Sequence, residues 1–156
     1  MQNGFITIEL GDIALLEQYR DVFLNSTLFD HYYAEDDRLR VHLMRALRDK
    51  ELLVGKSGDE IVSVMEVRMT GFFGGFPYLA LLGVKKGWRG MGIGHQMLAF
   101  FEEMARQAGF ERTSIMASGF NPRARKLYQS LGYRRIGFLE DAFKPGISEY
   151  IYVKTL

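Results

Sequence analysis

The sequence predicts an α/β fold in which a mixed β-sheet carries helices on both faces. The first observation is that apolar, strand-like runs alternate with segments whose apolar residues recur at helical spacing, a pattern typical of α/β proteins. The second is size, because 156 residues suit one domain, expected to span residues 1–156. The third is composition, since 47% hydrophobic and 25% charged residues are ordinary values for a globular chain.

The N-terminal region predicts one strand followed by two helices. Residues 5–10 have the composition of a strand, and Asp12 can cap the helix that follows. The apolar residues of that helix recur at helical spacing: Ile13, Leu16, Tyr19, Val22 and Phe23. Residues 25–35 predict a polar and aromatic loop. The second helix, over residues 36–49, places three leucines on one face: Leu39, Leu43 and Leu47.

A β-hairpin and a third strand are expected next. Residues 51–56 and 60–70 have strand composition and flank the turn signal Ser57-Gly58-Asp59. A glycine- and phenylalanine-rich turn over residues 71–75 then leads to a strand over residues 76–84. These segments therefore predict three consecutive strands in the middle of the chain.

The second half of the chain contains the clearest helix, which begins near Gly92. Its apolar residues lie at i, i+4, i+8, i+11, i+12 and i+15: Ile93, Met97, Phe101, Met104, Ala105 and Ala108. Gly109 stands where a helix-terminating glycine belongs. A strand over residues 110–117 precedes a helix capped by Asn121, begun by Pro122 and ended by Gly132. Strands over residues 134–139 and 150–153 complete the sheet.

The segment Arg89-Gly90-Met91-Gly92-Ile93-Gly94 connects a predicted strand to this clearest helix. The first N–H groups of a helix lack intrahelical partners, and the helix dipole adds partial positive charge there. Because glycines let an anion approach the backbone closely, the segment predicts a pyrophosphate cradle. A P-loop needs a glycine, four further residues and then Gly-Lys-Ser/Thr. The chain's Gly-Lys-Ser sequence is Gly55-Lys56-Ser57, and the position that would need the first glycine is Lys50. The glycine segment is not a dinucleotide fingerprint, since His95 occupies the third glycine position.

Three segments in order resemble the GCN5-related N-acetyltransferase (GNAT) family. Arg89 to Gly94 matches the family's Q/R-x-x-G-x-G/A loop, and Leu82-Gly83-Val84 is similar to its splayed central strand. Residues 121–133, with Asn121, Tyr128 and the closing Gly132-Tyr133 pair, are similar to the family's next helix. The resemblance spans about residues 77–138. It implies a single N-acetyltransferase domain over residues 1–156, with a mostly antiparallel mixed sheet and a splayed central strand pair.

The resemblance also implies acetyl-CoA as cofactor. Backbone amides of the glycine loop would hold the pyrophosphate, and the Val84 N–H would face the acyl oxygen. Asn121 would contact the pantetheine arm or simply cap its helix, and Arg125 would meet the 3′-phosphate. The expected cofactor-binding residues are Leu82, Val84, Arg89, Gly90, Met91, Gly92, Ile93, Gly94, Asn121 and Arg125.

Tyr128 is the expected general acid, and Glu66 is the candidate base. A phenol with a pKa near ~10 can protonate a departing thiolate whose conjugate acid has a pKa near ~8.5. From periodicity alone, Tyr128 would be an ordinary core residue. Glu66 shares a strand face with Val62 and Val64, where a charge should not lie unpaired, so it lines the cleft or forms a salt bridge. His31 and an amine that needs no base remain alternatives.

The acceptor site is expected in residues 25–38 and 70–78. Acidic and aromatic side chains gather in the first segment, which suits a cationic amine or merely a solvated helix start: Phe29, Asp30, Tyr32, Tyr33, Glu35, Asp36 and Asp37. The second segment is aromatic and could cover the acceptor, form a homodimer contact or enter the core: Phe72, Phe73, Phe76 and Tyr78.

These observations predict direct acyl transfer from acetyl-CoA to a primary amine of a small molecule or peptide. The absence of cysteine excludes a cysteine acyl-enzyme and thiolate metal sites. The three histidines show no metal spacing, so no metal is expected. A net charge of +1 does not favour nucleic acid, and no apolar run suits a membrane span, so a cytoplasmic location is expected.

Two alternatives remain open at this stage. One is a non-catalytic acyl-CoA sensor of the same fold. The other is a nucleic-acid binder that uses a basic patch composed of Arg123, Arg125, Lys126, Arg134 and Arg135.

Overall fold

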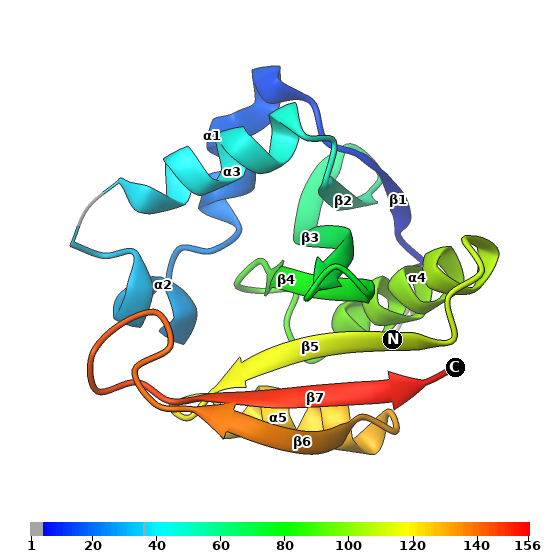
Figure 1. The fold of residues 1–156 in the computed structure, drawn as a ribbon. Coiled ribbons are helices and arrows are strands. Elements are labelled where there is room, and N and C mark those ends of the chain that lie inside the picture. Colours follow the sequence, from blue (N-terminus) through cyan, green and yellow to red (C-terminus); the bar gives the residue numbers. More distant parts are fainter. Residues whose placement is uncertain (1–4, 36) are drawn as a thin grey trace. The chain divides into compact units, whose positions relative to one another are not determined.

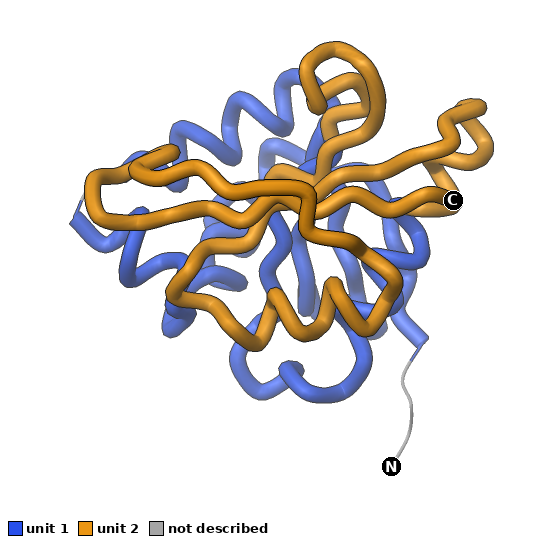
Figure 2. The backbone as a smooth tube through the Cα atoms, turned by 60° about the horizontal axis from the view of Figure 1, so that its bottom comes forward, with its two compact units in different colours: residues 1–67, 81–101 blue, residues 68–80, 102–156 orange. Residues whose placement is uncertain are grey.

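The computed structural model describes residues 5–35 and 37–156. The chain forms two compact units (Figure 2), the first composed of Met1–Val67 and Leu81–Phe101 and the second of Arg68–Ala80 and Glu102–Leu156. Two strands and one helix each pass from one unit into the other, because the boundaries fall within residues 60–72, 76–84 and 93–107.

Strands and helices alternate along the chain as the sequence predicts (Figure 1). The strands are β1 (Thr7–Leu10), β2 (Leu52–Ser57), β3 (Glu60–Phe72), β4 (Phe76–Val84), β5 (Arg112–Ser118), β6 (Arg134–Leu139) and β7 (Glu149–Thr155). The helices are η1 (Ile13–Leu15), α1 (Leu16–Asp21), α2 (Thr27–Tyr32), α3 (Arg38–Arg48), α4 (Ile93–Gln107) and α5 (Pro122–Ser130). The sheet order is β1-β2-β3-β4-β5-β7-β6. The sheet is mixed and mostly antiparallel, with a parallel β4–β5 pair, so the predicted α/β class is confirmed.

In the first unit, helices cover both faces of the β2–β3 hairpin. The register sets Val54 of β2 opposite Val64 of β3, and both side chains join an apolar core with Tyr19 of α1 and Leu43 of α3. On the opposite face, a Cβ added to Gly55 would lie 3.1 Å from the Met97 sulfur of α4. Since alternate strand residues point to opposite faces, each face of the hairpin buries its own apolar set.

The second unit is built on the antiparallel strands β5, β7 and β6. The β5–β7 register runs from Arg112 opposite Thr155 to Ser118 opposite Glu149. The parallel β4–β5 register includes Tyr78 opposite Ser114, and the Ser114 hydroxyl donates to the Pro77 carbonyl at 2.9 Å. These pairings hold the first part of β4 beside β5. The splay that the family implies farther along β4 stays a prediction.

The main error of the sequence prediction lies in residues 25–35, where the structure contains α2 instead of a loop. Ser26 caps this helix, because its Oγ accepts from the Phe29 N–H at 3.1 Å. Six residues are too few for apolar periodicity to be visible. The first predicted helix is also divided, since it begins as the 3₁₀ turn η1 and α1 ends at Asp21.

Several boundaries also differ from the prediction. β3 extends to Phe72, and β7 runs from Glu149 to Thr155. The predicted start of the second helix at Asp36 lies outside the described residues. Among the helices that the structure describes, none is long and apolar enough to cross a membrane.

Candidate functional site

The glycine loop adopts the backbone conformation that an anion cradle requires. Gly90 has φ 78° and Gly92 has φ 81°, both in the left-handed region that favours glycine. Met91 between them is exposed, whereas Ile93 is buried and anchors the first residue of α4. Turns of this kind bring successive N–H groups to one side of the backbone, and here they precede a fifteen-residue helix. The loop therefore presents amide donors next to the positive end of the α4 dipole.

Arg89 uses its side chain to hold this loop. Its Nε donates to the Val84 carbonyl at 2.8 Å, and its Nη1 donates to the Asn25 carbonyl at 3.0 Å. One guanidinium thus joins the end of β4 to the turn that precedes α2. The sequence predicted Arg89 as a cofactor residue, and its described contacts position the glycine loop.

The end of β4 is packed closely between β3 and the turn that follows α1. The Ser63 hydroxyl donates to the Gly83 carbonyl at 2.7 Å, and the Lys85 N–H donates to the Val62 carbonyl at 2.8 Å. A Cβ added to Gly83 would lie 2.4 Å from the buried Phe23 ring. The position therefore requires glycine for steric reasons, although its φ is ordinary.

Glu66 is wholly buried, with 0% of its side chain exposed. Its Oε1 contacts Arg45 Nη2 and its Oε2 contacts His42 Nε2, and both of these side chains come from α3. Arg45 also donates to Asp49 and to Glu51, each at 3.0 Å. The Glu66 carboxylate is thus paired, as the salt-bridge alternative expected. The side chains that pair with it belong to α3.

His42 is a residue that the sequence analysis missed, because nothing in the local pattern links α3 to β3. Tyr33 lies beside it, with ring centroids 6.4 Å apart in an edge arrangement. Burial, together with the negative charge of Glu66, raises the pKa of Tyr33 to about 12. Tyr33 is therefore a neutral phenol next to the Glu66–His42 pair.

In the second unit, Asn121 caps α5, because its Oδ1 accepts from the Ala124 N–H at 3.1 Å. Arg125 lies over the Tyr150 ring at 4.8 Å, and Arg135 lies over the same ring at 5.3 Å. Two members of the predicted basic patch therefore contact an aromatic face, a favourable cation–π arrangement.

Tyr128 is buried on α5, and its ring meets those of Tyr133 and Tyr152 edge-on at 6.1 and 6.2 Å. Burial raises its pKa well above the ordinary tyrosine value, and Tyr78, Glu149 and Tyr152 act in the same direction. Tyr128 consequently keeps its proton throughout the working pH range.

Glu149 belongs to a second buried polar pair that the sequence analysis missed. The Ser118 hydroxyl donates to Glu149 Oε1 at 2.5 Å, and both residues are buried at the β5–β7 pairing. Such a pair follows from strand register, which single-sequence patterns do not reveal.

The predicted site residues divide between the units. The first unit brings together the glycine loop, Leu82, Val84 and Glu66, and the second contains Asn121, Arg125 and Tyr128. Among the described residues, no cluster of three histidine, aspartate or glutamate side chains is arranged to hold a metal ion.

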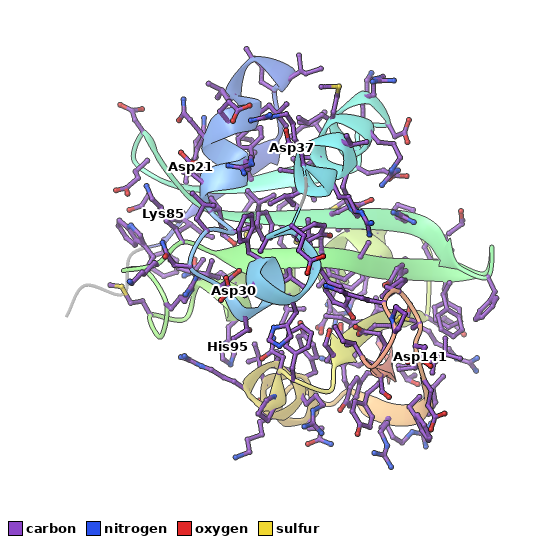
Figure 3. All side chains as sticks on the ribbon, turned by 90° about the vertical axis from the view of Figure 1, so that its left-hand side faces the viewer. Asp21, Asp30, Asp37, Lys85, His95 and Asp141 are labelled. Carbon is purple, nitrogen blue, oxygen red and sulfur yellow. The ribbon has the colours of Figure 1, made fainter. Side chains whose placement is uncertain are left out.

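Two acidic side chains of the first predicted acceptor segment lie on α2 and at the start of α3. Figure 3 shows Asp30 on α2 and Asp37 at the start of α3. Asp37 pairs with Arg40 and lies 3.7 Å from the Arg20 Nε, so part of the acidic cluster is neutralised. The prediction at Asp36 lies outside the described residues.

The aromatic turn is partly stacked. Phe72 stacks on Phe76 at 4.6 Å between ring centroids and meets Phe73 edge-on at 5.0 Å. Phe73 is 91% exposed. The turn thus ends in an exposed aromatic side chain, as a cover or a contact surface would require.

The chain is similar to known acetyltransferases in sequence pattern and in fold. The model of the acetyltransferase (GNAT) family matches residues 13–133, whereas no curated protein matches the chain. An acetyltransferase from Thermus thermophilus has 20% identity and a TM-score of 0.77, with 100% of both chains covered. A GNAT-family acetyltransferase from Bacillus cereus has 17% identity and a TM-score of 0.75, with 97% of this chain and 98% of that chain covered.

A third solved structure is Arabidopsis thaliana Naa50 in complex with the bisubstrate analogue CoA-Ac-MVNAL. It has 19% identity and a TM-score of 0.73, with 97% of this chain and 99% of that chain covered. These structures share the fold, and the family model spans the glycine loop and Tyr128. The chain belongs to the acetyltransferase (GNAT) family.

Proposed function

We propose that the chain is an acetyl-CoA-dependent N-acetyltransferase that passes the acyl group directly to a primary amine of a small molecule or peptide. The observation that carries this proposal is the left-handed Gly90 and Gly92 pair at the start of α4. On this proposal both compact units, residues 1–156, form one N-acetyltransferase domain. Naa50, which shares the fold, has been solved with a bisubstrate analogue that joins CoA to a peptide.

The cofactor is held mainly by backbone groups. The amides of Gly90, Gly92, Ile93 and Gly94 bind the pyrophosphate, since they precede or begin α4. The Val84 N–H donates to the acyl oxygen as negative charge develops there, and the splay of β4 from β5 gives the pantetheine arm access to the strand. The alternative of a nucleic-acid binder loses support because Arg125 and Arg135 lie over Tyr150.

Two side chains move protons in this proposal. Tyr128 protonates the sulfur as the C–S bond breaks, and its raised pKa keeps the proton available for that step. Glu66 drives deprotonation of the amine, since it is a buried carboxylate on the strand next to β4. Because the chain has no cysteine, the acyl group passes in one step without a cysteine acyl-enzyme.

Ligand-dependent thermal stability tests the cofactor assignment. Acetyl-CoA at about 100 times its dissociation constant should add roughly 2.7 kcal/mol of apparent stability, so Tm should rise with acetyl-CoA and CoA but not with NAD. Thiol release should then be measured with tyramine, putrescine and the peptide Met-Val-Asn-Ala-Leu as acceptors. A Tm rise without turnover on these amines would indicate an acyl-CoA sensor, and no Tm rise would contradict the cofactor proposal itself.

Replacing Arg89 with alanine should raise the KM for acetyl-CoA about 30-fold and leave kcat nearly unchanged. The reason is that two hydrogen bonds that hold the loop, each worth about 1 kcal/mol, are lost. The matched control is Arg106→Ala on α4, whose guanidinium contacts Glu103 at 3.5 Å at the surface. Steady-state kinetics on both variants check the prediction, and an equal KM in the two would show that Arg89 does not position the loop.

A further inference from the structure

The contact between Glu66 and His42 has the geometry of a carboxylate-oriented imidazole. Glu66 is buried, and its Oε2 contacts the Nε2 of His42. A carboxylate only accepts hydrogen bonds, so Nε2 carries the donated proton and the neutral ring has its lone pair on Nδ1. The two ring nitrogens diverge, so Nδ1 is directed away from Glu66. His42 keeps 26% of its side chain exposed, which gives a reactant access to the ring.

Glu66 lies on β3, the strand next to β4, and His42 reaches it from α3. Glu66 is three residues beyond Ser63, whose hydroxyl bonds the Gly83 carbonyl of β4. Leu81 of β4 belongs to the same apolar cluster as Leu43, the α3 residue next to His42. Hence α3 shares an apolar core with the β4 residue directly before Leu82–Val84.

Two further side chains, Arg45 and Tyr33, complete the surroundings of the Glu66–His42 pair. The second oxygen of Glu66 contacts Arg45, which fixes the orientation of the carboxylate. Tyr33 borders the His42 ring from the segment after α2 and stays neutral, because its pKa is raised to about 12. Among the described residues, His42 thus contacts Glu66 of β3 and Tyr33 of that segment, and Glu66 connects it to Arg45 of α3.

We propose that His42 is the catalytic base of the transfer and that Glu66 is its positioning residue. This assignment rests on the proposed N-acetyltransferase function and makes the role of Glu66 indirect. The amine lone pair forms the C–N bond to the thioester carbonyl carbon, and the N–H proton passes to His42 Nδ1. The C–S electron pair leaves with sulfur, which takes the Tyr128 proton, giving an amide and a free thiol. The imidazolium, stabilised by Glu66, returns its proton to solvent, and the Tyr128 phenolate takes a proton back from solvent, which restores both side chains.

The experiment compares the wild-type chain with His42→Gln, His42→Ala and Glu66→Gln. Acetyl-CoA is the donor, and the most reactive amine among tyramine, putrescine and the peptide Met-Val-Asn-Ala-Leu is the acceptor. His42→Gln should lower kcat about 10²-fold, a usual size for loss of a general base. The KM for acetyl-CoA and the CoA-induced rise in Tm should not change, since the residues proposed to bind the cofactor do not belong to α3.

Two readouts separate catalysis from a structural role. The acidic limb of the kcat/KM profile, which reports the base, should shift in Glu66→Gln and disappear in His42→Gln. Added imidazole should restore activity to His42→Ala saturably, because the cavity left by the side chain is partly exposed. Glu66→Gln should retain more activity than His42→Gln, since the imidazole remains present.

Several outcomes would overturn the assignment. One is a His42→Gln profile identical to that of the wild type, and another is loss of the acidic limb in His31→Gln with His42→Gln unaffected. His31 is the rival histidine in this region, and its Nδ1 lies 2.7 Å from the Thr27 carbonyl. If the wild type turns over none of the amines, both the proposed function and this inference fail. If the wild type is active and His42→Gln is unimpaired, only the inference fails.

Discussion

Replacing Tyr128 with phenylalanine should lower kcat about 10²-fold and leave acetyl-CoA affinity unchanged. The substitution removes the hydroxyl that would protonate the leaving sulfur, and general acids typically contribute factors of this size. The ring contacts with Tyr133 and Tyr152 are retained, so packing changes little. Steady-state kinetics together with the acetyl-CoA-dependent Tm shift measure the two effects separately.

Tyr133→Phe is the matched control, because Tyr133 is a buried tyrosine of the same cluster. It loses the hydrogen bond of 3.1 Å to Thr113 Oγ1, so stability should fall by about 1 kcal/mol while kcat stays near wild type. Turnover in Tyr128→Phe equal to that in Tyr133→Phe would remove Tyr128 from the mechanism.

The raised pKa of Tyr128 also predicts the alkaline behaviour of the protein. Its folded-state pKa lies above the unfolded value of about 10, so the folded state retains this proton longer as pH rises. The contribution to stability is complete below about pH 10 and is lost as pH rises further. We therefore expect no decline of kcat from phenol ionisation below about pH 10. A decline that is present in the wild type and absent in Tyr128→Phe would contradict this prediction.

Gly83→Ala should destabilise the fold by about 1–3 kcal/mol, the usual cost of overpacking. The new Cβ would lie 2.4 Å from the Phe23 ring. Phe23 is 1% exposed, so its ring is enclosed by the core. Because the ring or the strand must shift, the Val84 N–H should also move and kcat should fall. Urea unfolding reports the first effect as a lower midpoint at constant slope.

Gly137→Ala on β6 provides the comparison for this substitution. No heavy atom lies within 4 Å of the added Cβ at that position, so stability should change by no more than about 0.5 kcal/mol. Equal urea midpoints for the Gly83→Ala and Gly137→Ala variants would show that the Phe23 ring can shift without a loss of stability.

The parts of the site that local chemistry specifies could be predicted from the sequence. The start of α4 after the glycine loop and the Asn121 cap of α5 were predicted correctly. Both depend on residues within a few positions of each other, through left-handed glycine conformation and side-chain capping. The residues proposed to hold the cofactor's pyrophosphate are specified locally in this way.

Tertiary packing decided the features that connect distant residues. Arg89 bonds a carbonyl 64 positions away, at Asn25, and Glu66 meets His42 across 24 positions. The steric requirement at Gly83 exists only because Phe23 packs against it. None of these has a local signature, because each depends on which faces of helix and strand meet.

By itself, then, the sequence determined the α/β class, the order of the strands and of the longer helices, the glycine loop and the family resemblance. These follow from periodicity, glycine conformation and capping, which act over one or two helical turns. Only the tertiary structure decided that Arg89 braces the loop and that Glu66 lies beside an imidazole. Those contacts form when side chains far apart in the chain are buried together. Because an unpaired buried charge is costly, it is paired with a group from another part of the chain.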